Sequence, residues 1–334
     1  MLLPPSTNGT KQEQNLHGMD KEFATFVGRP PQLCGKYCVT DLPLDVSEFI
    51  VTDSLESFEA AKAQLDSNGW SRAETLNPAY GQRVQYLLTM LREEVLELLL
   101  GPSLSDVSDK AKHLLSRLTQ TWDSVPHREF EPSQLDSMRP HIRWIVLGTR
   151  LDYLYSQFLL FKLLISQSEE YRDNLIDTLH VILRLTMSNW KRNDSIYTRG
   201  IGLEWTLVFY AMPCASILAL ELFRHDRQLG QSPKLDRSAA IQDISLLISC
   251  CESLAKTGQS NNQIYKQAQR TFVQCLDQIL NRSAGLPGSS GHQIRGTHSE
   301  GPLSWDPLDH CLAELYPEDP EWSAWLETFS MQVE

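Results

Sequence analysis

The sequence lacks an excess of basic residues. Its 30 Lys and Arg residues face 42 Asp and Glu residues, which gives a formal net charge of −12 and a pI near 5.3. Modules that bind nucleic acid neutralise phosphates with clustered Lys and Arg side chains, and the chain has no such cluster. The composition therefore argues against direct binding to nucleic acid, and we expect none.

The sequence also lacks a set of Cys and His residues with the spacing of a metal site. Its seven cysteines are spread along the chain. Only Cys34 and Cys38 approach the spacing of metal ligands, and no Cys or His pair nearby completes a tetrahedral set. Their odd number and the missing apolar leader near Met1 favour free thiols in a reducing compartment. We therefore expect no structural metal and no cofactor.

No apolar run is long enough to predict a membrane span. The longest uncharged stretch is Trp205–Leu220, which has 16 residues and contains Pro213. As a helix it would extend about 24 Å, short of the roughly 30 Å hydrocarbon core of a bilayer. We interpret it as a buried core helix and expect no membrane partner.

Motifs of the common enzyme classes are missing as well. The chain contains no nucleophile elbow, phosphate-binding loop or helical zinc-protease motif. A single imperfect di-iron-like motif ends at His180, which we expect to pack or hydrogen-bond rather than bind metal. We interpret Glu93, Glu94 and Glu97 as solvated carboxylates on an exposed helix face. The sequence thus predicts no catalytic residues and no enzyme, although a site built from distant residues leaves little trace in one sequence.

What the sequence does contain is helical periodicity. The stretch opened by Asn77-Pro78 and ended by Gly101-Pro102 has valines and leucines on one face and polar residues on the other, among them Arg92 and Glu93. No alternating run is long enough for a sheet, so the predicted fold class is all-α, a multi-helix domain of about eight long amphipathic helices. The predicted helices cover residues 53–67, 78–101, 105–122, 140–166, 169–191, 201–225, 238–256 and 262–281.

Composition divides the chain into five parts. The polar start predicts disorder, the following Gly- and Pro-containing stretch predicts an extended connector, and the helical part is followed by a Gly- and Ser-rich linker and an acidic tail. The predicted bounds are 1–20 for the disordered N-terminus, 21–52 for the connector, 53–283 for the helical domain, 284–303 for the linker and 304–334 for the tail.

The tail has the strongest charge asymmetry of the chain. Residues 305–334 contain eight acidic residues and no Lys or Arg. As a helix, Trp322, Trp325, Leu326 and Phe329 would share one face with the i, i+3, i+4, i+7 spacing of side chains that enter a hydrophobic groove. We predict that these four residues bind a partner. The alternative is that the tail folds back onto its own domain, because tryptophans are costly to leave in water.

One stretch of the connector resembles a known family. Phe26-Val27-Gly28-Arg29-Pro30-Pro31-Gln32-Leu33, followed by Asp41-Leu42-Pro43-Leu44-Asp45, is similar to a signature of the regulatory (middle homology) domain of fungal zinc-cluster transcription factors. In that family a Gly-Arg-Pro segment closes a helical part, and an extended stretch with a proline-containing acidic turn precedes further helices. The resemblance covers about residues 20–285. Only residues 26–45 match the sequence motif of the family, and the rest matches in its helical pattern.

The resemblance implies a transcription regulator in the nucleus. It implies control of a metabolic or secondary-metabolite pathway through protein partners, either the transcription machinery or a DNA-binding regulator, with a small-molecule effector as a further option. The chain departs from the family because the family's basic six-cysteine segment, which binds zinc and reads DNA, is missing from these residues. Two alternatives stay open: an all-α enzyme or small-molecule-binding protein of a biosynthetic pathway, and an adaptor that works through the acidic tail.

Overall fold

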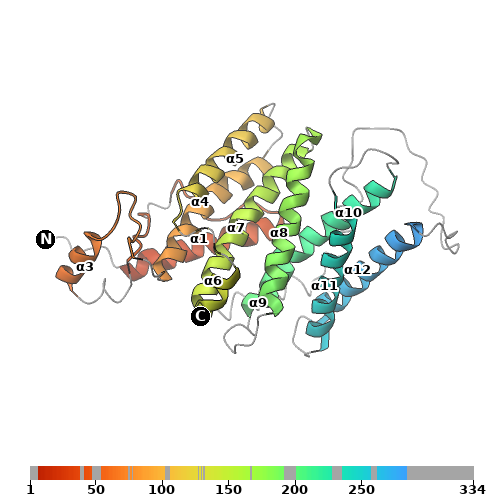
Figure 1. Cartoon of the computed structure of the whole chain (residues 1–334). Coiled ribbons are helices and arrows are strands. Elements are labelled where there is room, and N and C mark those ends of the chain that lie inside the picture. Colours follow the sequence, from red (N-terminus) through yellow and green to blue (C-terminus); the bar gives the residue numbers. More distant parts are fainter. Residues whose placement is uncertain are drawn as a thin grey trace. The chain divides into compact units, whose positions relative to one another are not determined.

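The regular structure of the described residues is helical. Figure 1 shows the computed structural model, which contains no strand among these residues and one isolated bridge between Leu65 and Ser71. The predicted all-α fold is therefore confirmed. The residues fall into two units that divide inside one helix, between Thr178 and Leu179. The structure describes residues 7–37, 41–46, 54–73, 76, 78–101, 106–126, 128, 130, 132–165, 168–191, 201–227, 235–256 and 262–283.

The first unit is organised around helix α4 (Pro78–Leu100). It packs against α1 (Thr7–Val27), α5 (Val107–Asp123) and α7 (Pro140–Ile165), which is apolar on most of its surface because it is buried against α4 and α5 (Figure 1). A Cβ atom at Gly81 of α4 would lie 2.1 Å from Ile145 Cγ2, so a glycine is required for this close approach to α7. Shorter elements complete the unit: α3 (Leu55–Lys62), α6 (Pro132–Ser137), η1 (Glu169–Tyr171) and the first turns of α8 (Arg172–Lys191).

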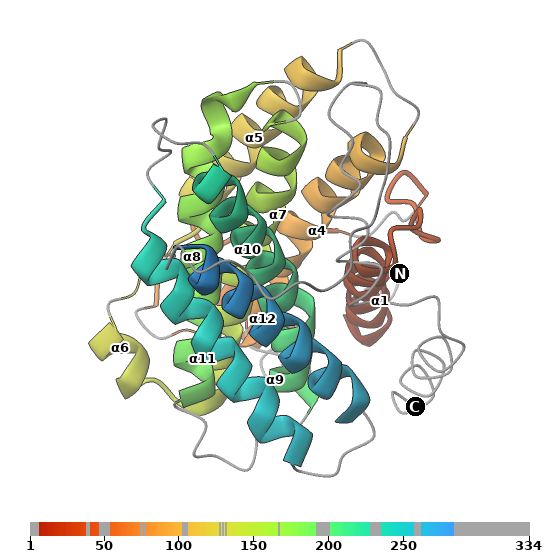
Figure 2. The same ribbon diagram turned by 90° about the vertical axis from the view of Figure 1, so that its right-hand side faces the viewer.

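The second unit contains the rest of α8 and the helices that follow it. These are α9 (Ile201–Thr206), η2 (Leu207–Ala211), α10 (Met212–Arg227), α11 (Arg237–Lys256) and α12 (Asn262–Ser283). The last three pack against one another, and Figure 2 shows α11 and α12 side by side. The η2 turn is π-helical and lies just before Pro213, which has no N–H to donate to the preceding turn.

Two stretches of the second unit are long and apolar enough to cross a membrane by length and composition. They are Glu204–Leu222 and Arg237–Lys256, and 83% of the apolar window of the first is buried inside the fold. Most of the stretch Trp205–Leu220 is buried, and its α10 part packs against α11 and α12, in agreement with its interpretation as a core helix.

The predicted helices correspond to observed ones with small differences at their ends. The exceptions are α6, which the sequence did not predict, and the N-terminus. There Thr7–Val27 form α1, so residues 7–20 are not disordered and residues 21–27 are not part of an extended connector. The buried positions of α1 include His17, Lys21 and Ala24, which share a helix face but give no hydrophobic period. Residues 28–37 and 41–46 are not helical, as predicted for the connector.

Some of the predicted features lie outside the described residues. These are Cys38, the whole predicted linker 284–303 and the whole tail 304–334. The assignment of partner binding to Trp322, Trp325, Leu326 and Phe329 therefore stays a prediction.

Candidate functional site

The candidate site is formed where residues 28–37, the Gly-Arg-Pro segment, fold back along α1. Gly28 has φ +67° and ends the helix, and the Arg29 N–H donates to the Ala24 carbonyl at 3.2 Å. This left-handed conformation costs other residues roughly 1 kcal/mol or more, so glycine suits the position. The segment therefore begins with a sharp reversal that a glycine allows.

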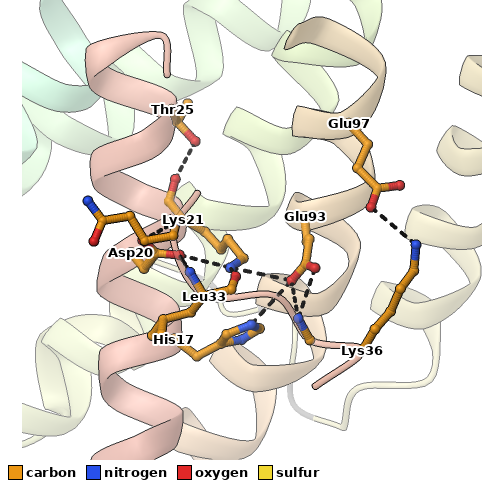
Figure 3. A network of polar contacts seen from close by, with 10 residues as sticks. His17, Asp20, Lys21, Thr25, Leu33, Lys36, Glu93 and Glu97 are labelled. Atoms are coloured by element: carbon orange, nitrogen blue, oxygen red, sulfur yellow. Dashed lines mark hydrogen bonds and ion pairs between the residues drawn. The ribbon is translucent and has the colours of Figure 1, made fainter. Parts of the chain in front are cut away.

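Two neighbouring residues of α1 bind the backbone of the returning segment. The Gln32 and Leu33 N–H groups each donate to one oxygen of Asp20 at 2.9 Å, and the Lys21 ammonium donates to the Leu33 carbonyl and, at 2.9 Å, to Asp20 (Figure 3). Burial acts to raise the pKa of Asp20, but these amides and Lys21 outweigh it and lower the pKa. The carboxylate of Asp20 is thus stabilised in its charged form.

Glu93 of α4 joins the segment to the helical domain. The Gly35 N–H donates to both oxygens of Glu93, at 2.9 and 3.0 Å, and Lys21 Nζ and His17 Nε2 lie 3.4 and 3.2 Å from Oε2 (Figure 3). Burial favours the neutral acid, yet the Gly35 amide, the Lys21 charge and the Cys34 thiol lower the pKa of Glu93. We call Asp20, Lys21 and Glu93 the charge cluster.

The burial of Glu93 corrects its interpretation as a solvated carboxylate. Glu93 is only 7% exposed, because α1 and the Gly-Arg-Pro segment cover the polar face of α4. Glu94 and Glu97 fit the prediction better: their side chains are 43% and 56% exposed and pair with Arg117 and Lys36. The sequence pattern identified the polar face but could not indicate that another helix covers it.

The charge cluster is arranged to hold structure together. Lys21 is 1% exposed and lies between two carboxylates, while burial and the Lys21 charge lower the pKa of His17 and keep its ring neutral. Each of the three charges contacts the Gly-Arg-Pro segment or bridges α1 and α4. A proton-transfer site needs a group whose pKa lies near the working pH, and neither carboxylate of the cluster meets that condition.

A group that does titrate near neutrality lies beside the cluster. A recess of about 20 Å³, lined by residues of α1, α4 and α7 that include Glu22, Arg92 and Asp152, has room for one water molecule. Burial and the Asp152 charge raise the pKa of Glu22 to about 8, against the opposing effects of Arg92 and Gln85. Glu22 is therefore protonated at neutral pH. The recess itself is far smaller than a pocket that holds a metabolite.

Residues 41–46, the Asp-Leu-Pro segment, are attached to the same helix α4. Arg83 donates to the carbonyls of Pro43 and Asn68, and its guanidinium lies 4.7 Å from the ring centre of Trp70. The buried Asp45 accepts a backbone N–H from the turn after Trp70 at 3.0 Å. The Gly-Arg-Pro segment and the Asp-Leu-Pro segment are thus each fixed on α4 by a buried charged side chain.

The second unit contains a buried His–Asp pair. His180 Nδ1 lies 2.8 Å from Asp243 Oδ2, which confirms that this histidine is engaged in a hydrogen bond. Its Nε2 is buried and has no hydrogen-bond partner within the described part of the chain. The buried thiols of Cys214 and Cys251 in this unit are unreactive, because burial raises the pKa of Cys251 to about 12 and also raises the pKa of Cys214.

Neither a metal site nor a known relative supplies an identity. Within the described ranges no three His, Cys, Asp or Glu side chains are grouped so that they could hold a metal ion. Comparisons with protein-family models, curated proteins and solved structures gave no match. The features of this chain that bear on its function are therefore the Gly-Arg-Pro and Asp-Leu-Pro segments and their attachment to α4.

Proposed function

We propose that this chain is a transcription regulator that resembles the regulatory domain of fungal zinc-cluster factors and acts through protein contacts. It works in the nucleus on a metabolic or secondary-metabolite pathway, and a protein partner that reads DNA or belongs to the transcription machinery carries its effect to the promoter. The four tail residues Trp322, Trp325, Leu326 and Phe329 are the proposed partner-binding anchors.

One observation carries the proposal. The two halves of the signature are separated in sequence, yet each is bound by a buried charge of α4: Glu93 holds the Gly-Arg-Pro segment and Arg83 holds the Asp-Leu-Pro segment. Two proline-containing turns that match a signature by chance would not be expected both to bind buried charged side chains of the same helix. This arrangement favours a genuine relationship over a coincidental pair of turns.

The runner-up, an all-α enzyme or small-molecule-binding protein, gains no comparable support. The recess beside Glu22 has room for about one water molecule, and Lys21 is fully engaged in the charge cluster. The His180 ring is buried, and its Nδ1 is already bound to Asp243.

The proposal is tested by fusing the full chain to an unrelated DNA-binding module and measuring a reporter with moderate basal expression. We expect the fusion to change reporter output in one direction relative to the module alone. The double substitution Trp322→Ala with Trp325→Ala should abolish the change, because both tryptophans belong to the proposed partner-binding anchors. The matched control Trp305→Ala, a tail tryptophan outside the four anchors, should keep it. An abundant, folded fusion with the output of the module alone would refute the proposal.

A second measurement concerns DNA directly. At a net charge of −12 the purified chain should not retard duplex DNA in a gel-shift assay at physiological salt. Tight, sequence-selective retardation would show that the chain reads DNA itself, contrary to its proposed dependence on a partner.

A further inference from the structure

Exposed apolar side chains are concentrated around the Gly-Arg-Pro segment. Among the described residues seven large apolar side chains stay exposed, and four of them lie between residues 16 and 37. Tyr37 is 87% exposed, and the preceding Lys36 side chain is 76% exposed. We call Val27, Arg29, Leu33, Lys36 and Tyr37 the segment surface.

The backbone beneath the segment surface is fixed. Leu33 donates its N–H to Asp20 and accepts from Lys21, Gly35 is bound to Glu93, and the Tyr37 N–H closes a turn onto the Cys34 carbonyl at 3.0 Å. A surface with a fixed backbone loses little conformational entropy when it binds. The segment therefore presents its exposed side chains in an arrangement prepared for a partner.

The segment surface carries two basic residues and no acidic one. Residues 23–40 contain Arg29 and Lys36 and no acidic residue, although the whole chain carries a net charge of −12. The contact of Lys36 with Glu97 is 3.7 Å long and exposed on both sides, so it holds Lys36 weakly. Glu93 lies nearby but is bound to Lys21 and Gly35. The surface thus fits an apolar segment that carries negative charge.

We propose that the segment surface binds the acidic aromatic tail of the same chain, residues 305–334. The tail has eight acidic residues and no Lys or Arg, and its four apolar anchors Trp322, Trp325, Leu326 and Phe329 have the spacing of one helix face. The anchors cover Leu33 and Tyr37, and the surrounding carboxylates lie near Arg29 and Lys36. The contact is a property of the purified chain and does not rest on the proposed role in transcription. A partner that uses the same anchors has to displace it.

Photochemical crosslinking of the full chain tests this contact. Tyr37 is replaced by the photoreactive residue p-benzoylphenylalanine, the purified chain is irradiated, and crosslinked peptides are identified by mass spectrometry. We expect crosslinks to residues 305–334. The matched control places the same probe at Leu55, which is 74% exposed but lies outside the segment surface, and should give no tail crosslink. A tail crosslink from Leu55 as strong as that from Tyr37, or none from Tyr37, would overturn the proposal.

Charge reversal and isotope mixing complete the test. In the chain with the Tyr37 probe, the double substitution Arg29→Glu with Lys36→Glu should reduce the tail crosslink about tenfold at low salt, because it turns attraction into repulsion. Lys110→Glu on α5, also an exposed lysine, should leave it unchanged. An unchanged crosslink in the double variant would contradict the charge argument.

Isotope mixing distinguishes docking within one chain from docking between two copies. Crosslinks between isotopically light and heavy chains would assign the tail to a second copy and refute docking within one chain.

Discussion

Glu22 provides the sharpest test of the physical reasoning about α1. Its carboxyl is half-buried beside Asp152, and burial together with that charge raises its pKa from 4.5 to about 8. In the unfolded chain the same group titrates near 4.5, so between pH 4.5 and 8 folding requires Glu22 to bind a proton. Stability from this residue is therefore greatest below pH 4.5 and falls as the pH rises towards 8. Glu22→Gln keeps the shape of the side chain but cannot ionise, so it should remove this loss of stability with rising pH.

The size of the effect follows from the pKa. Each pH unit between 4.5 and 7 costs about 1.4 kcal/mol, which sets an upper bound of about 3.4 kcal/mol at pH 7. Glu22 is only half-buried, and water that enters the recess reduces this value. We expect Glu22→Gln to stabilise α1 by about 1–2 kcal/mol at pH 8 and by nearly nothing at pH 5.

Hydrogen exchange followed by mass spectrometry measures this effect locally, which suits a chain of two units. The exchange of α1 peptides is compared between wild type and Glu22→Gln at the same pH, so that intrinsic exchange rates cancel. Protection should rise about tenfold in the variant at pH 8 and stay equal at pH 5. Glu13→Gln, an exposed carboxylate of the same helix, serves as the control and should show no pH-dependent difference. A constant ratio from pH 5 to 8, or lower protection in Glu22→Gln, would refute the argument.

Three further changes probe the attachments to α4, each read by thermal unfolding of the full chain. Glu93→Ala should destabilise the first unit by about 3 kcal/mol because it leaves Lys21 buried with less compensation, whereas the exposed Glu97→Ala should change stability by less than about 0.5 kcal/mol. Arg83→Met should cost about 1–3 kcal/mol, since the carbonyls of Pro43 and Asn68 lose their buried donor; an unchanged melting temperature would refute that role. Gly81→Ala should cost about 1–3 kcal/mol through its clash with the stiff Ile145, and a neutral result would contradict the close packing of α4 and α7.

Local signals explain what the sequence could predict. The helix α4 begins at Pro78 and is followed by Gly101, as its start and stop residues predict. The predicted helix 262–281 corresponds to α12, and its apolar positions Phe272 and Ile279, which have helical spacing, are buried in the structure. The hydrophobic period is a property of the helix itself, so it can be read without knowledge of its neighbours.

The candidate site could not be predicted in the same way. The buried residues His17 and Lys21 do have helical spacing ahead of Gly28, but a helix face made of charged residues is usually solvated. Whether Glu93 is exposed depends on α1, a separate element whose own pattern gave no signal. The charge cluster is thus a tertiary feature, formed by residues whose individual patterns indicate a surface.

The two attachments on α4 have opposite charges because they bind opposite ends of the peptide group. Arg83 binds carbonyls of the Asp-Leu-Pro segment and the neighbouring turn, while Glu93, about 15 Å further along the helix, binds an N–H of the Gly-Arg-Pro segment. A non-helical segment placed against a domain must satisfy its backbone polar groups, and these side chains do so directly. Because the backbone supplies the attachment, a side chain such as Tyr37 can remain exposed without loosening the segment. That division of roles is what a binding surface on a loop requires: a fixed backbone on one side and available side chains on the other.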